Sequence, residues 1–271
     1  MNIEIRWSLG VVYGVLLSSV MLGYAAEPDT PPKRLNERDE NNKKRRLAMV
    51  HMIDDLANHN KMPKLVKKGV GKLPLYPADY DWKEEKRVAL ALAKINKERS
   101  EELWDELVRR SGDEHYCRTV KDQNEYYAMG NWTVGIFCSI LADDWLLGIC
   151  QQHLPSDPNK DGYRISLDFG IGKSGGLRKW RNDRGNKTLY ELQINVCEEA
   201  IRELTKIPGI PQRNKEGAQK KIEGEIAKLK KLKRAIFTDY SSEPMRCYSE
   251  KEAVKIRESL QKQIDNKKKD C

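Results

Sequence analysis

A glycine-rich run, Gly170 to Gly176, holds the residues of this 271-residue chain that come closest to a known chemical motif, Gly-Lys-Ser. A nucleotide-binding Walker A loop also requires a glycine five positions before the glycine of Gly-Lys, and Leu167 occupies that position. The sequence therefore disfavours nucleotide binding and predicts a flexible loop. Backbone amides of such a loop are able to form a nest for an anion. The basic side chains predicted to bind a polyanion there are Lys173, Arg178, Lys179 and Arg181.

The best local concentration of metal ligands is the run from Asp113 to Cys117, which includes His115. A protein metal site usually needs three or four convergent ligands, and the sequence has no HExxH, CxxC or HxxE pattern. We therefore predict a polar helix terminus here, and neither a metal ion nor another cofactor.

Acidic pairs supply the candidates for hydrolytic catalysis, because two carboxylates suffice for glycan hydrolysis. The four candidates are Asp143, Asp144, Glu198 and Glu199. Solvated helix faces also carry such pairs, and no Ser or Cys nucleophile motif stands in a recognisable setting. A non-catalytic protein is the favoured interpretation, so no catalytic residue is assigned.

The chain has six cysteines, an even number that permits disulfides if the protein reaches an oxidising compartment. The possible disulfide cysteines are Cys117, Cys138, Cys150, Cys197 and Cys247, whereas Cys271 follows a lysine run at the chain end. Their scattered positions assign no connectivity. The alternative is that they are small, buried apolar residues on helix faces.

Residues 1–25 have the pattern of a secretory signal peptide. Arg6 precedes an uncharged run from Trp7 to Ala26, and Gly23 and Ala25 are small residues at −3 and −1 of a cleavage site. We predict an exported protein, periplasmic or secreted. The alternative is an uncleaved N-terminal anchor, which would be the only expected attachment to a membrane.

Composition and periodicity then divide the remaining chain. Residues 26–46 are charged and rich in proline, which predicts a disordered tether. Residues 47–210 predict a helical domain interrupted by a Gly-rich irregular insertion at 154–187, in which Tyr163 to Phe169 alternate like a strand. Residues 211–271 predict a C-terminal helical hairpin.

Several residues predict where these helices begin. Ser100, Thr133 and Thr188 are expected N-caps, and Thr188 forms a capping box with Glu191. Asp143 or Asp144 is expected to cap a second helix of the central segment.

The segments KRVALALAKI, SEELWDELV and NWTVGIFCSIL place one helix pair after another within residues 82–153. This pattern resembles the stacked hairpins of HEAT-like repeat proteins. The resemblance implies a mainly α fold, an irregular HEAT-like array of stacked helical hairpins. It also implies a surface for binding or scaffolding rather than catalysis.

The net charge is +9, and basic residues gather at 61–72, 173–187 and 220–234. Such patches attract polyanions through counterion release. For an exported protein this favours a protein or an anionic envelope polymer as partner and disfavours nucleic acid. The leading hypothesis is an exported bacterial helical protein that binds or scaffolds at the cell envelope. The alternatives are an envelope glycan or peptidoglycan hydrolase that uses the paired carboxylates, and a self-associating structural protein.

Overall fold

The computed structural model describes residues 33–121, 127–157, 165, 167, 169–238 and 246–269. The chain divides into two compact units, Met1–Asn41 and Asn42–Cys271. In the first unit the described residues, 33–41, are helical. The second unit contains the core described below.

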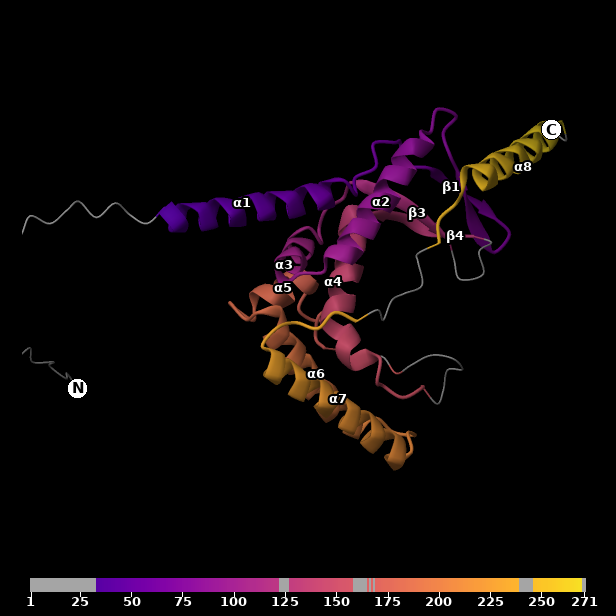
Figure 1. Cartoon of the computed structure of the whole chain (residues 1–271). Coiled ribbons are helices and arrows are strands. Elements are labelled where there is room, and N and C mark those ends of the chain that lie inside the picture. Colours follow the sequence, from indigo (N-terminus) through magenta and orange to yellow (C-terminus); the bar gives the residue numbers. More distant parts are fainter. Residues whose placement is uncertain are drawn as a thin grey trace, which may run out of the picture. The chain divides into compact units, whose positions relative to one another are not determined.

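The described part of the chain is mainly helical, which confirms the mainly α part of the predicted fold (Figure 1). The helices are α1 (Lys33–Asp54), α2 (Trp82–Glu98), α3 (Glu101–Arg109), α4 (Val134–Gln151), α5 (Leu177–Asn182), α6 (Leu189–Lys206), α7 (Gln212–Leu232) and α8 (Glu250–Lys269). The strands are β1 (Lys64–Lys68), β2 (Gly71–Leu75), β3 (Tyr116–Lys121) and β4 (Ala128–Thr133).

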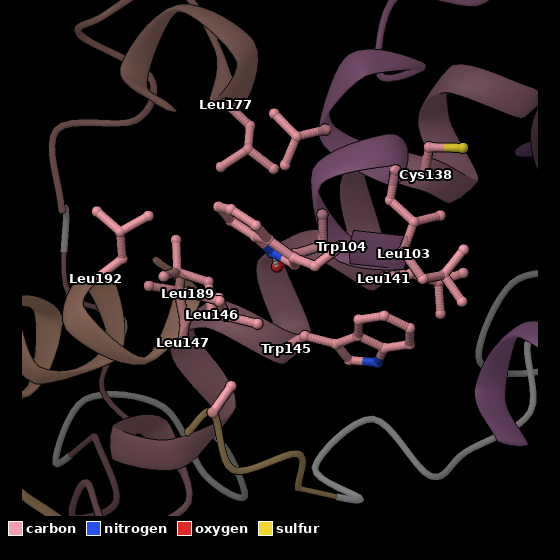
Figure 2. Close-up of a cluster of buried hydrophobic side chains, with 14 of the residues drawn as sticks. Leu103, Trp104, Cys138, Leu141, Trp145, Leu146, Leu147, Leu177, Leu189 and Leu192 are labelled. Atoms are coloured by element: carbon pink, nitrogen blue, oxygen red, sulfur yellow. Dashed lines mark hydrogen bonds between the residues drawn. The ribbon is translucent and has the colours of Figure 1, made fainter. Parts of the chain in front are cut away.

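The main hydrophobic core surrounds Trp104 of α3, which is fully buried. Figure 2 shows this ring among Leu177 of α5, Leu146 of α4 and Leu189 of α6. The indole nitrogen donates a hydrogen bond to the carbonyl of Ala142 at 2.9 Å, so the only polar atom of the side chain is satisfied. The core therefore joins four helices that are far apart in sequence.

Helices α6 and α7 pack against one another as an antiparallel pair, and α6 also packs on α4 (Figure 1). Pro208 and Gly209 form the turn after α6. The sequence predicted a C-terminal hairpin over residues 211–271, in which α7 would pack against α8. In the structure α8 packs against β2, so each of these helices has a partner other than the predicted one.

The predicted N-caps are confirmed. The side chains of Ser100 and Thr133 accept hydrogen bonds from backbone amides of α3 and α4, and Thr188 forms its capping box with Glu191. The predicted start of a new helix at Asp143 or Asp144 is wrong, because α4 continues through both residues. Its long buried face, from Val134 to Cys150, holds the helix together across them.

Two antiparallel hairpins lie within residues 47–210, where the sequence predicted a helical domain. Strands β1 and β2 pair from Lys64 opposite Leu75 to Lys68 opposite Gly71, and Gly69 makes the turn with φ of +59°. The density of proline and glycine in this region concealed the hairpin. Strands β3 and β4 pair from Tyr116 opposite Thr133, with bulges. Because β4 ends at Thr133 and α4 begins at Val134, the strand leads directly into the helix.

A buried chain of hydrogen bonds ties α2 to β3. Glu85 accepts from Arg118 at 2.8 Å and from the Tyr80 hydroxyl at 2.6 Å. The Tyr80 hydroxyl lies 3.1 Å from that of Tyr116, which in turn contacts Thr119 at 3.0 Å. These partners satisfy polar groups that would otherwise be costly to bury.

The Gly-rich insertion is less irregular than predicted. It contains α5, and Leu154, Ile165, Phe169, Leu177 and Trp180 are all buried. Ile165, Leu167 and Phe169 lie outside any strand, and the rest of the predicted strand-like alternation lies outside the described residues.

Helix α1 begins at Lys33, inside the segment predicted as a tether. Its residues from 39 to 48 are exposed, and Met49 and Ile53 are the first to enter the core. Helix-favouring Lys, Arg and Glu residues account for this solvated extension of a helix whose end is buried.

Candidate anion-binding site

Helix α5 is held against the core by two apolar anchors. Leu177 and Trp180 are buried, and the Trp180 indole nitrogen donates to the Phe169 carbonyl at 2.9 Å. The preceding glycine-rich run folds into tight turns, with positive φ at Gly170 and Gly175. This arrangement leaves the backbone free to turn into α5 without strain from a side chain.

Arg178 of α5 reaches the C-terminal end of α3. Its guanidinium donates a hydrogen bond to the carbonyl of Arg109 and lies near Gly112. A cation is favoured at a helix C-terminus, where the last carbonyls lack helical partners. Arg178 therefore joins α5 to α3, two helices that are far apart in the sequence.

Arg181 lies one turn further along α5 and faces α3 as well. Its Nε donates to Asp105 at 3.3 Å, and its guanidinium lies 5.6 Å from the centre of the Trp104 ring. Its side chain is 16 % exposed, so these contacts hold it in place.

Two surface hollows adjoin this contact, with volumes of about 580 and 570 Å³. The first is lined by Arg109, Arg110, Gly112, Asp113, Glu114, His115 and Arg178. The second is lined by Asp105, Val108, Arg109, Arg178, Arg181, Asn182, Gly185 and Asn186. Arg109 and Arg178 border both hollows, so the two are parts of one surface.

The carboxylates beside these hollows neutralise three of the four arginines. Arg109 pairs with Glu106, and Arg181 pairs with Asp105. Arg110 is 2.6 Å from both Asp54 and Asp113. Arg178 makes no ion pair with a carboxylate in the described part of the chain. A guanidinium has five N–H donors, so Arg178 has donors left for an external anion.

The structure brings together two of the four residues predicted to bind a polyanion, Arg178 and Arg181. Lys173 and Lys179 are exposed but line neither hollow. Sequence reasoning missed Arg109 and Arg110, whose only local signal is their place at the end of a helix, just before Gly112.

Of the potential metal ligands in the Asp113 to Cys117 run, Asp113 and His115 meet, whereas Cys117 lies apart from them. His115 Nδ1 lies 2.7 Å from Asp113, whose carboxylate also contacts Arg110. His115 is exposed, whereas Cys117 is fully buried in the core. The three side chains thus face different surroundings.

The paired carboxylates also differ in their surroundings. Burial, followed by the charge of Asp144, raises the pKa of Asp143 to about 6. Glu198 lies 3.8 Å from Lys230 of α7, and Glu199 interacts with Arg184. None of the hollows described above is lined by these four acids.

No disulfide joins any of the five cysteines in the described residues. Cys117, Cys138, Cys150 and Cys197 are fully buried, and Cys247 is half-buried. Cys138, Cys150 and Cys197 are buried on helix faces, as the alternative prediction described, whereas Cys117 lies in β3 and Cys247 lies outside any helix.

Within the residues that the structure describes, α4 alone is long and apolar enough to cross a membrane, and 67 % of it is buried in the protein. Comparison of the chain with protein-family models, curated proteins and solved structures found no match.

Proposed function

We propose that the protein is a non-catalytic helical binding or scaffold protein, exported to the bacterial cell envelope, that engages an anionic partner through the surface between α3 and α5. The observation that carries this proposal is the position of Arg178, which borders both hollows and has donors to spare. A planar guanidinium matches phosphate and carboxylate groups in two-point contacts. An anionic envelope polymer offers many such groups in succession.

The HEAT-like mode of action belongs to the same proposal. The resemblance to HEAT-like repeats covers residues 82–153. The antiparallel pair α6 and α7, which packs on α4, supports a scaffold of stacked helices beyond that range. On this view the helices are a rigid support, and the α3–α5 surface is what they present.

Binding of a soluble polyanion tests the proposal. Polyphosphate is titrated into the purified protein by calorimetry at two salt concentrations, with neutral dextran as the uncharged comparison. Arg178→Gln is the test variant. Lys179→Gln removes the same charge from the neighbouring, exposed residue, which lines neither hollow.

We expect binding that weakens with salt, as counterion release requires. Loss of one charge-assisted hydrogen-bonding group costs about 1.5 kcal/mol, so Arg178→Gln should weaken binding about tenfold and Lys179→Gln much less. Equal effects of the two variants would mean that net charge alone attracts the polymer. Failure of the wild-type protein to bind polyphosphate would refute the site.

A second candidate function, an envelope glycan hydrolase, is favoured by one observation. Asp143 has a raised pKa of about 6, and its Oδ1 is buried with no hydrogen-bond partner in the described residues. A carboxyl group that keeps its proton near neutral pH is suited to act as a general acid. If this function is correct, wild-type protein should release fragments from peptidoglycan. Asp143→Asn should abolish the release, and Glu223→Gln on the exposed face of α7 should not.

A further inference from the structure

Two buried thiols lie on neighbouring helices of the core. Cys150 is in the last turn of α4 and Cys197 is in α6, and both are fully buried. Buried thiols usually act as small apolar residues, so what distinguishes these two is their relation to one another.

The register of the two helices places the cysteines at the same level of the α4–α6 interface. Both helices run in the same direction (Figure 1), and the Gln193 side-chain amide donates to the Trp145 carbonyl at 2.8 Å. Cys197 lies about one helical turn beyond Gln193, and Cys150 lies about one and a half turns beyond Trp145. The two residues therefore reach the same level of the α4–α6 interface.

The thiols are in direct contact at this level. The Cys150 thiol donates its proton to the Leu147 carbonyl at 3.1 Å, so it is the acceptor in its hydrogen bond with Cys197. This hydrogen bond, together with burial, raises the pKa of Cys197. In the folded protein the pair is thus held as thiols, with the two sulfur atoms adjacent.

A chain of polar contacts links the pair of thiols to the surface. Glu225 of α7 interacts electrostatically with Cys197, and it contacts His153 at 3.3 Å and Lys228 at 2.9 Å. The Lys228 side chain is 63 % exposed. Separation of α7 at this point would open a path from solvent to the dithiol.

We propose that Cys150 and Cys197 form a redox-active dithiol, which closes to an intramolecular disulfide between α4 and α6 on reaction with a low-molecular-weight disulfide. When α7 separates and solvent reaches the pair, one cysteine loses its proton and, as thiolate, attacks a sulfur of the oxidant, whose S–S bond breaks and releases one thiol. The second cysteine then attacks the mixed disulfide and displaces the second thiol. One S–S bond forms, both cysteines lose their protons, and the oxidant is reduced to two thiols.

The inference is independent of the anion site, because it involves none of that site's residues. It assigns one pairing among those that the sequence left open. It also gives the protein a covalent tie between two core helices wherever the surroundings are oxidising.

The test uses the full chain, reduced and then exposed to oxidised glutathione under native conditions. Proteolysis without reduction, followed by mass spectrometry, identifies the linked peptides. Cys197→Ser removes one partner, and Cys138→Ser changes another fully buried cysteine of α4. Circular dichroism establishes that each variant is folded, and Cys197→Ala replaces any serine variant that is not.

We expect a peptide that contains Cys150 linked to Cys197 in the wild-type and Cys138→Ser proteins. The oxidised protein should also unfold at a higher temperature than the reduced one. In Cys197→Ser, Cys150 should stop at the mixed disulfide with glutathione. The proposal is overturned if the folded wild-type protein forms no such link, or forms it only in guanidinium. A predominant link to a different cysteine would also overturn it.

Discussion

Gly135 allows the first turn of α4 to lie directly against the backbone of residues 111–113. A β-carbon at this position would stand 2.7 Å from the backbone nitrogen and oxygen of Asp113 and 2.8 Å from the Ser111 carbonyl. The close approach also supplies hydrogen bonds, because the amides of Val134 and Gly135 donate to the carbonyls of His115 and Asp113 at 2.8 Å. These amides would otherwise be unpaired at the helix start.

Gly135→Ala should therefore destabilise the protein, by about 1–3 kcal/mol, since the backbone must shift to admit one carbon atom. Gly224→Ala is the matched control on α7, where a β-carbon would meet nothing within 4 Å. It should raise stability by about 0.5–1 kcal/mol through helix propensity. Urea unfolding at neutral pH measures both, and similar effects of the two variants would contradict the packing described for Gly135.

Gln193 is a fully buried amide that links α6 to the segment after α7. Its side-chain nitrogen donates to the Trp145 and Ile236 carbonyls, each at 2.8 Å, and its oxygen accepts from the Ile236 amide at 3.0 Å. The same side chain therefore satisfies both backbone groups of Ile236.

Gln193→Met preserves the volume but leaves the two backbone groups of Ile236 without their partner. We expect a loss of about 1–3 kcal/mol in the free energy of unfolding, because the two part-buried backbone groups of Ile236 lose their hydrogen-bond partner. Gln212→Met, at an exposed position of α7, should have little effect. Thermal and urea unfolding measure the stability of both variants. Equal stabilities of Gln193→Met and Gln212→Met would contradict this role of Gln193.

At the scale of elements, α8 is attached by a charged contact at its N-terminus. Glu252 accepts from Lys121 of β3 at 2.7 Å and from the backbone amide of Ser249 at 2.8 Å. Lys121 is buried, at 8 % exposure, and its nitrogen lies 5.3 Å from the centre of the Tyr248 ring. Burial alone would raise the pKa of Glu252, but the hydrogen bonds from Lys121 and Ser249 outweigh it and lower the pKa to about 2.

This contact should make stability depend on pH in the acid range. A carboxylate with a depressed folded-state pKa contributes stability that is fully present above the ordinary value of 4.5 and is lost as the pH falls toward about 2. Glu252→Gln should cost about 1–2 kcal/mol at pH 7, since half-exposed ion pairs are screened by solvent. The difference between variant and wild type should shrink as the solution is acidified.

The measurement is urea unfolding at a series of pH values, with Glu258→Gln on the exposed face of α8 as the control. A difference between Glu252→Gln and wild type that stays constant from pH 7 to low pH would show that the ion pair is not its source.

At the scale of the whole molecule, the predicted signal peptide implies a mature chain shorter than the full sequence. We expect protein purified from the cell envelope to have an intact mass that begins at Ala26, because small residues at Gly23 and Ala25 precede that bond. Intact mass spectrometry with and without reduction measures the cleavage and any disulfide together. A full-length mass would contradict cleavage, and recovery of the protein only from the cytosol would contradict export.

The local features of this chain were predictable because short-range interactions set them. Ser100, Thr133 and Thr188 cap helices through contacts with amides only a few residues away. The apolar stripes that predict α2, α3, α6 and α7 report the burial of one helix face. The basic character of Arg178 and Arg181 was likewise readable from the sequence.

Tertiary packing decided what these features became. The burial of α4 carried one helix through Asp143 and Asp144, where local capping preference predicted a break. Pairing with a partner strand made β1 and β2 out of a segment rich in Lys, Gly and Pro. Helix α7 packed against α6 rather than α8, because helix–helix pairing depends on complementary surfaces and not on the order of elements.

The two sites show the same division. By itself the sequence determined a mainly helical chain with basic residues near α5 and six cysteines of unassigned role. Only the tertiary structure placed Arg178 beside Arg109 of α3, and Cys150 level with Cys197. Residue type and helical period are local properties, whereas the meeting of side chains from distant elements is fixed by how the core packs them.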